Sequence, residues 1–142
     1  MTDRPRALVT GGAIRLGRAM ALDLAAAGWD VAVHYGSSGD AAAETVREAA
    51  RHGNRAAALQ ADLLDETQVA RLVGRAAEAL GGPLSLLVNN ASIFEHDDFA
   101  SMTRTSWDRA IESNLRAAVK LTQDFAAQAP GPETDGWGEP VA

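Results

Sequence analysis

Short apolar runs and helical patterns alternate along almost the whole chain, and this alternation limits the fold more than any other feature. Four runs are spaced as strands, at residues 6–10, 30–35, 55–61 and 84–89. The spacing of apolar residues predicts helices over residues 16–27, 40–52, 65–80 and 106–129. Strands that alternate with helices are typical of a parallel sheet covered by helices. The pattern therefore predicts an α/β fold with a doubly wound parallel sheet.

The composition excludes several classes of function. The chain has 142 residues, 46% of them hydrophobic and 23% charged, which is typical of a globular protein. Its net charge of −6 argues against a nucleic-acid-binding surface. It has no cysteine, and three adjacent residues such as His96, Asp97 and Asp98 rarely converge on one ion, so we expect no metal site. No apolar run is long enough to span a membrane, and a strand pattern begins too close to Met1 for a signal peptide. We expect a cytoplasmic protein without nucleic-acid or membrane partners.

The segment from Thr10 to Gly17 has the composition of a phosphate-binding turn. It reads Thr-Gly-Gly-Ala-Ile-Arg-Leu-Gly and lies between the first predicted strand and the first predicted helix. A pyrophosphate needs backbone N–H groups at a helix N-terminus and no Cβ atom where the chain approaches closely. Gly11 and Gly17 meet the second need, and the helix that begins near Leu16 meets the first. A plain tight turn would also use glycine, but the position within a β-α-β unit favours nucleotide binding.

Four motifs resemble those of the short-chain dehydrogenases/reductases. The segment from Thr10 to Gly17 resembles the family's Thr-Gly-x-x-x-Gly-x-Gly motif, and Asn89-Asn-Ala-Ser92 resembles its Asn-Asn-Ala-Gly motif. Asp62 and Leu63 end the third strand, where the family contacts adenine. Asn114 stands where the family places the helix asparagine of its Asn-Ser-Tyr-Lys tetrad. The resemblance implies a Rossmann-like doubly wound sheet with strand order 3-2-1-4, here without its C-terminal part.

Two departures from these motifs resemble the pteridine reductases. Arg15 replaces the middle glycine of the first motif, and Ser92 replaces the last glycine of the second. Phe94 falls where pteridine reductases place a phenylalanine that stacks on the pterin, and His34-Tyr35 is also similar to that group. A flat heteroaromatic substrate suits aromatic stacking, and a guanidinium can bind both phosphate and a ring substituent. The alternatives are that Arg15 binds only phosphate and that Phe94 only packs in its loop.

The residues after the second strand favour NADP(H) over NAD. NAD enzymes usually place an acidic side chain there, which would repel a 2′-phosphate. Here no acidic residue precedes Asp40. Ser37 and Ser38 can donate to a phosphate, and Arg15 or His34 can supply positive charge. The arginine that pteridine reductases often have near Ser37 is absent.

The predicted site follows from these motifs and from the resemblance. The cofactor-binding residues are Gly11, Ile14, Arg15, Leu16, Gly17, His34, Tyr35, Ser37, Ser38, Asp62, Leu63, Asn90, Ala91 and Ser92. Ser92 and Phe94 are expected to face the substrate. The resemblance implies that Asn114 has a catalytic role in supporting a proton-relay water.

The tyrosine and lysine that complete the family's reaction are not found in their pattern. Tyr35 is the only tyrosine and Lys120 the only lysine, and they do not form the family's Tyr-x-x-x-Lys pair, which would fall beyond Ala142. We therefore expect a fragment that is inactive alone, with a naturally short protein as the alternative. Residues 1–129 are expected to form an NADP(H)-binding domain, and residues 130–142, with three prolines and three glycines, a loop.

The expected function is that of an NADPH-dependent short-chain reductase, similar to pteridine reductases, that transfers hydride to a C=N or C=O bond. The alternatives are a carbonyl reductase of the 3-oxoacyl-carrier-protein type and a non-catalytic dinucleotide-binding module. The expected partner is a small-molecule substrate, a pterin or a carbonyl compound. The resemblance also implies a homo-oligomer, a dimer or tetramer, that uses the long helix containing Asn114.

Overall fold

A computed structural model describes residues 3–131 and shows helices and strands in strict alternation through the fourth strand. The elements in chain order are β1 (Arg6–Val9), α1 (Arg15–Ala26), β2 (Asp30–Tyr35), α2 (Gly39–Ala49), the 3₁₀ turn η1 (Ala50–His52), β3 (Ala56–Gln60), α3 (Glu66–Leu80), β4 (Leu86–Val88), α4 (Arg104–Ile111), the π-helical turn η2 (Glu112–Arg116) and α5 (Ala117–Gln128). All the predicted strands and helices are present, with bounds that differ by a few residues.

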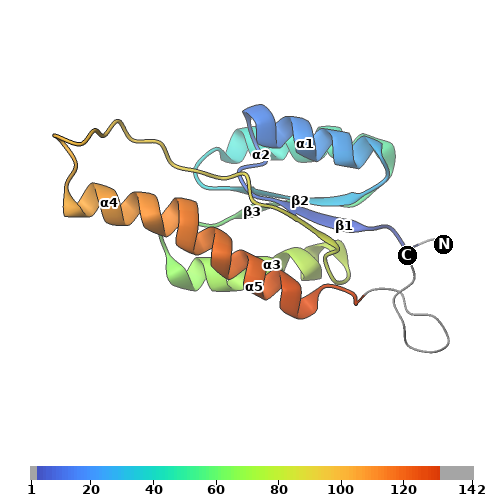
Figure 1. Ribbon diagram of the computed structural model, residues 1–142. Helices are drawn as coiled ribbons and strands as arrows, with labels where there is room; N and C mark the ends of the chain where they lie inside the picture. The colour runs from blue at the N-terminus through green and yellow to red at the C-terminus, as the bar shows by residue number, and fades with distance from the viewer. Residues whose placement is uncertain (1–2, 132–142) are drawn as a thin grey trace.

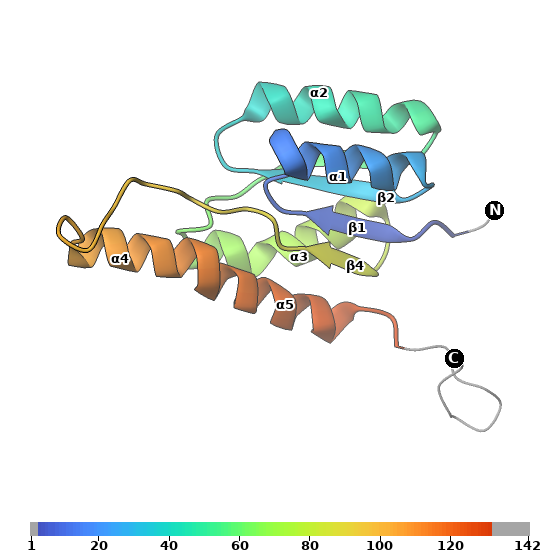
Figure 2. The ribbon, with the colours of Figure 1, turned by 45° about the horizontal axis from the view of Figure 1, so that its top comes forward.

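The four strands form one parallel sheet in the order β3-β2-β1-β4. Helices α1 and α2 cover one face of this sheet, and α3 and α5 cover the other (Figures 1 and 2). This arrangement confirms the predicted doubly wound α/β fold and its strand order. Because all strands run in one direction, their carboxyl ends and the loops that follow them meet at one edge of the sheet.

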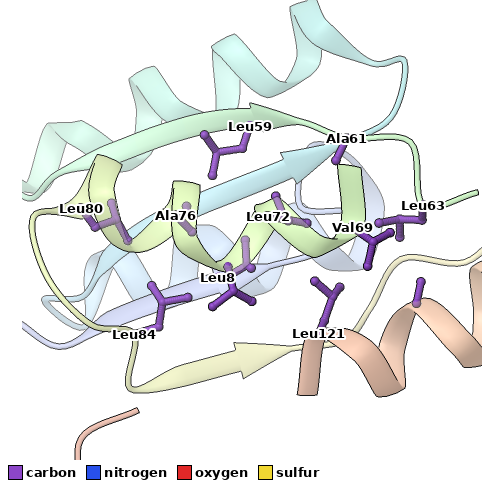
Figure 3. Packing of buried hydrophobic residues seen from close by; sticks show 13 residues of the cluster. Leu8, Leu59, Ala61, Leu63, Val69, Leu72, Ala76, Leu80, Leu84 and Leu121 are labelled. Atoms are coloured by element: carbon purple, nitrogen blue, oxygen red, sulfur yellow. The ribbon is translucent and has the colours of Figure 1, made fainter. Parts of the chain in front are cut away.

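The core is divided between the two faces of the sheet. Successive residues of a strand point to opposite faces, so Leu8 packs toward α3 and α5 while Val9 packs toward α1 and α2. Figure 3 shows the first cluster, in which Leu72 and Leu80 of α3 and Leu121 of α5 close over Leu8. The alanines of α1 and α2 let these helices lie close to the sheet on the other side. This packing holds the strand ends in fixed positions.

The segment Asp65-Glu-Thr-Gln68 at the N-terminus of α3 has the residue types of a capping box but forms only half of one. Asp65 caps the helix, and its Oδ1 accepts hydrogen bonds from the backbone N–H groups of Thr67 and Gln68 at 2.9 and 3.2 Å. The Gln68 side chain, however, accepts from the backbone N–H of Asp62 at 2.8 Å and not from that of Asp65. Asp65 therefore caps the helix as such a motif requires, whereas the Gln68 side chain bonds to the end of β3 and not back to the N-cap residue.

The predicted long helix is present but contains a π-helical turn. Figures 1 and 2 show α4 and α5 as one rod, and η2 joins them. The rod begins at Arg104, two residues earlier than predicted, because Thr103 and Ser106 form a capping box there. A π-helical turn is uncommon and frequently marks a functional site. Here it contains Asn114.

The apolar residues of this helix do not all face the core. Ser113, Ala117 and Leu121 are buried. Trp107, Ile111, Leu115 and Val119 are between 39% and 55% exposed and lie on the opposite side of the rod. The prediction of a helix is right, but three of the apolar residues whose spacing predicts it, Trp107, Ile111 and Leu115, point outward.

Two further expectations concern the C-terminal loop and membrane-spanning helices. Residues 132–142 of the predicted Pro/Gly-rich loop lie outside the part of the chain that the structure describes. Within residues 3–131, no helix has the length and apolar character that crossing a membrane requires.

Candidate functional site

A cavity of about 740 Å³ lies at the carboxyl ends of the strands. This volume is within the usual range for small-molecule sites. Its lining residues come from the turn after β1, the ends of β2 and β3, the loop after β4, and the long helix. The residues are Gly11, Ala13, Ile14, Arg15, Leu16, Gly17, His34, Tyr35, Gly36, Ser37, Ser38, Gln60, Ala61, Asp62, Leu63, Leu64, Asn90, Ala91, Ser92, Ile93, Arg109 and Ser113. The structure thus brings every predicted cofactor-binding residue to one cavity.

The turn after β1 presents unpaired backbone donors to this cavity. Within the described residues, the N–H groups of residues 14–17 have no hydrogen-bond acceptor, and the first helical bond runs from Arg18 N–H to the Ile14 carbonyl. Gly17 is buried beneath the turn, and a Cβ atom there would lie 2.0 Å from the Gly11 carbonyl oxygen. Unpaired N–H groups at a helix N-terminus attract anions. The turn fits a pyrophosphate.

Arg15 adopts a backbone conformation that favours glycine. Its φ is 51°, in the left-handed region, and among residues 3–131 no other residue with a side chain has a positive φ. This conformation costs a residue with a Cβ atom about 1–2 kcal/mol. The chain therefore retains the backbone shape of the glycine motif although arginine occupies its middle position. The guanidinium lines the cavity beside the turn.

Thr10 and Asn90 fasten the turn after β1 to the loop after β4. The Thr10 hydroxyl oxygen accepts from the backbone N–H groups of Asn90 and Ala91, both at 3.0 Å. The Asn90 side-chain amide donates to the carbonyls of Thr10 and Gly11 at 3.0 and 3.2 Å. The Asn90 side chain therefore holds the backbone of the turn in place, and Asn90 and Ala91 both line the cavity.

His34 has a different role from the one predicted. It is 2% exposed; its Nδ1 accepts from the Gly11 N–H at 3.0 Å, and its Nε2 lies 2.9 Å from the Ala61 carbonyl oxygen. These partners require a proton on Nε2 and a neutral ring. Burial lowers the pKa of His34, against the opposing effect of the Ala61 carbonyl. His34 therefore joins the ends of β1, β2 and β3, and of the two residues considered as a source of positive charge, Arg15 and His34, only Arg15 remains.

Ser37 and Ser38 lie at the start of α2. Ser38 is the N-cap residue, yet its side chain forms no capping hydrogen bond. Neither hydroxyl has a hydrogen-bond partner among residues 3–131. Two free hydroxyls beside a helix N-terminus suit a phosphate.

Asp62 shapes the end of β3. Its Oδ1 accepts from the backbone N–H of Leu64 at 2.9 Å, which turns the chain away from the sheet. This turn places Asp62, Leu63 and Leu64 along one wall of the cavity.

Asn114 holds the loop after β4. Its Oδ1 accepts from the Ile93 N–H at 2.8 Å, and its Nδ2 donates to the Ile93 carbonyl at 3.0 Å. It does not line the large cavity; it lines a smaller one of about 140 Å³ together with Phe94. The Phe94 side chain is 90% exposed. Its predicted contact with substrate stays a prediction.

Arg109 and Ser113 line the large cavity and were not predicted. Both belong to the row of helix positions, four residues apart, that continues through the buried Ala117 and Leu121. This row faces the body of the protein, so its first members reach past the strand ends. The spacing was visible in the sequence, but only the fold shows that the row ends at the cavity.

The part of the chain that the structure describes contains no group of three His, Cys, Asp or Glu residues arranged to hold a metal ion. The chemistry of the cavity is that of backbone donors, hydroxyls and arginine. These groups bind phosphate and sugar hydroxyls.

Comparison with known proteins identifies the family. The family model for short chain dehydrogenases matches residues 5–135. The chain belongs to the short-chain dehydrogenase family. It is 34% identical over 122 residues to the 3-oxoacyl-(acyl-carrier-protein) reductase FabG of Staphylococcus aureus, covering 86% of this chain and 49% of that protein. The chain therefore spans about half the length of the curated short-chain dehydrogenase that it matches.

Solved structures of similar fold include two proteins crystallised with NADP. The FolM alternative dihydrofolate reductase 1 of Brucella canis, complexed with NADP, has a TM-score of 0.84 and 37% identity, covering 93% of this chain and 52% of that one. A short chain dehydrogenase of Burkholderia cenocepacia in complex with NADP has a TM-score of 0.84 and 41% identity, covering 88% of this chain and 51% of that one.

Proposed function

We propose that residues 1–129 form the NADP(H)-binding part of a short-chain reductase. The observation that carries this proposal is the cavity at the strand ends, which is lined by residues 14–17 with their unpaired N–H groups. The pyrophosphate binds at this turn, beside Arg15. The main chain of Ala91 and Ser92 borders the nicotinamide ribose, while Asp62 and Leu63 border the adenine. Similar structures that contain NADP support the choice of cofactor.

Discrimination for NADP(H) over NAD(H) comes from the end of β2. Ser37 and Ser38 offer hydroxyls at the start of α2, and no carboxylate stands between Tyr35 and Asp40 to repel a 2′-phosphate. Since His34 is neutral and buried, the positive charge near this phosphate comes from Arg15.

Equilibrium titration with NADPH and NADH tests this proposal. Replacing both serines by alanine, Ser37→Ala with Ser38→Ala, should weaken NADPH binding about tenfold, because hydrogen bonds to a charged group are lost. NADH binding should stay the same, since NADH has no 2′-phosphate. Equal losses for both cofactors would place the phosphate elsewhere, and tighter binding of NADH to the wild type would contradict the proposal.

We infer that the complete enzyme transfers hydride from NADPH to a C=N or C=O bond of a flat heteroaromatic substrate, as in pteridine reductases. Arg15, Ser92 and Phe94 support this substrate class. Arg15 and Ser92 line the cavity, and Phe94 is exposed on the loop that follows. The similarity to an alternative dihydrofolate reductase agrees, because dihydrofolate contains a pterin ring.

A carbonyl reductase is the second candidate. The 34% identity to a 3-oxoacyl-(acyl-carrier-protein) reductase favours it. NADPH oxidation by a full-length protein containing this chain, with a dihydropterin or with an acetoacetyl thioester, separates the two. Turnover of the thioester alone would rule out the pterin assignment.

The chain of 142 residues by itself is proposed to bind cofactor without turnover. Tyr35 lines the cavity at the end of β2, and Lys120 pairs with Asp124 on α5 at 2.6 Å. They come from different elements and do not form a joint acid/base pair. A steady loss of NADPH absorbance with substrate and this chain alone would contradict this point.

We propose that copies of the chain associate as a homo-oligomer through the outer face of the long helix. Trp107, Ile111, Leu115 and Val119 form an exposed apolar stripe there, which we call the outer stripe. A self-complementary helix face is a common basis for two-fold dimers.

A further inference from the structure

The structure assigns a cofactor contact to Arg109, a residue outside the family motifs described above. Arg109 lines the large cavity from α4. It occupies the row of the long helix that continues through Ser113, Ala117 and Leu121, all three buried. Side chains of this row point toward the sheet, and at Arg109 the sheet has already ended. The arginine stem is therefore directed over the strand ends, where a ligand of the cavity must lie.

An ion pair holds one edge of the Arg109 guanidinium. Its Nη2 donates to Glu95 Oε1 at 2.6 Å, and its Nε donates to the two Glu95 oxygens at 3.1 and 3.3 Å. Glu95 belongs to the loop after β4. Within residues 3–131, Nη1 forms no hydrogen bond. A planar group held along one edge keeps its face and its remaining donor available.

The position of Arg109 relative to β3 indicates which part of a ligand it meets. It lines the same cavity as Asp62, the residue that turns the chain at the end of β3; the pKa of Arg109 is raised by its ion pair with Glu95 and, less strongly, by the charge of Asp62. Arg109 and the wall formed by residues 62–64 therefore line one cavity, and their charges interact across it. In the proposed function this wall borders the adenine.

We propose that the Arg109 guanidinium packs its plane against the adenine ring of the bound dinucleotide, opposite residues 62–64, with Glu95 fixing its orientation. This inference rests on the proposed NADP(H)-binding function. Arginine stacks well on flat aromatic rings because its charge is delocalised over a plane. The contact is common to NADPH and NADH, since both carry the same adenine.

Titration of the 142-residue chain with NADPH and with NADH, followed by the change in dihydronicotinamide fluorescence, tests this contact. Arg109→Ala should weaken the binding of NADPH and of NADH by the same factor, about fivefold to tenfold. Arg109→Lys should weaken the binding of both cofactors nearly as much, because lysine keeps the charge but lacks the planar guanidinium. Arg104→Ala is the matched control: it removes the same charge and a comparable ion pair, with Asp108, at a position five residues before Arg109 that does not line the cavity.

The outcomes separate this inference from the proposed function. Unchanged affinity of Arg109→Ala for both cofactors would overturn the Arg109 contact while wild-type binding sustains the proposed function. If Arg109→Ala lost affinity for NADPH alone, the guanidinium would contact the 2′-phosphate. If Arg109→Lys kept full affinity, only the charge of Arg109 would matter. Either result would overturn the stacking contact. A wild-type chain that binds neither cofactor would overturn both proposals. Circular dichroism of each variant shows whether the fold is kept.

Discussion

Arg15 combines backbone strain with a position at the cavity. Its left-handed φ of 51° is one that glycine adopts without cost. Strain of this kind is retained when the side chain contributes to function. In this account the contribution is a guanidinium beside the pyrophosphate turn.

Arg15→Gly should therefore have opposite effects on stability and on binding. Relief of the strained φ, reduced by the greater flexibility of glycine in the unfolded chain, should raise the free energy of unfolding by about 0.5–1 kcal/mol. Loss of the guanidinium should weaken NADPH binding by at least about tenfold. Urea unfolding and NADPH titration measure the two effects. A variant that is less stable, or one that binds NADPH as the wild type does, would refute this interpretation of Arg15.

His34 should make the stability of the fold depend on pH. Burial lowers the pKa of His34 in the folded state below its ordinary value of 6.5. The unfolded chain therefore takes up a proton at a higher pH than the folded one. The stabilisation is fully present above about pH 6.5 and is lost as the pH falls from there through the lower folded-state pKa, by at most about 1.4 kcal/mol per pH unit.

His34→Gln provides the comparison for this pH dependence. Glutamine keeps an acceptor for the Gly11 N–H and a donor for the Ala61 carbonyl, and it does not titrate. Urea unfolding between neutral and mildly acidic pH should show a smaller loss of stability in the variant. His52 and His96 are present in both proteins, so the difference belongs to His34. Parallel curves for the two proteins would contradict the assignment.

At the residue scale, the sequence predicted which positions line the site better than what their side chains do. Every predicted cofactor-binding residue lines the cavity, because backbone turns at strand ends follow from glycine and strand patterns. The buried role of His34 could not be predicted, since it depends on the distance between the ends of β1 and β3. Arg109 was missed because a charged residue on a helix is usually solvated surface.

Among the elements, the long helix departs most from a regular pattern. The π-helical turn η2 contains Asn114, whose side-chain amide accepts from the Ile93 N–H through its oxygen and donates to the Ile93 carbonyl through its nitrogen. The sequence predicted the helix from its apolar spacing. It could not predict the π-helical turn, because a single extra residue per turn leaves almost no trace in that spacing. The Asn114 contact therefore couples the helix to the loop that carries Ser92 and Phe94.

Asn114→Ala should loosen this loop. Loss of two hydrogen bonds at an exposed position should lower the free energy of unfolding by about 1–2 kcal/mol. Hydrogen exchange at the Ile93 amide should become faster, while exchange in β1 is unchanged. Asn114→Asp keeps the acceptor for the Ile93 N–H and loses the donor, so it should give an intermediate protection. Unaltered exchange at Ile93 in the alanine variant would show that the side chain does not hold the loop.

For the molecule as a whole, the outer stripe bears on assembly. Leu115 lies near its middle and is 55% exposed. Light scattering coupled to size exclusion should find the chain larger than a monomer, and Leu115→Glu should return it to a monomer because charges are costly in an apolar contact. Ala79→Glu on the exposed side of α3 is a control that should leave the assembly intact. A monomeric wild type would contradict the proposed homo-oligomer.

The overall architecture was predictable because few topologies join alternating strands and helices. Right-handed crossovers and short connections restrict such chains to a small number of strand orders, and the motif resemblance selected one of them. The confirmed order β3-β2-β1-β4 places the turn after β1 beside the loop after β4, where Thr10 and Asn90 connect them. The exact bounds of β4 and α4 depended on tertiary contacts and capping that the pattern does not specify.

The cavity at the strand ends is proposed to bind NADP(H). Amide NMR spectra of the isotopically labelled chain, recorded during titration with NADPH, test it most directly. The largest shifts are expected at residues 14–17, 37–38, 62–64 and 90–93, which line the cavity, and small shifts in the core of the sheet. Saturable shifts confined to other surfaces, or none with NADPH well above micromolar concentration, would contradict the account.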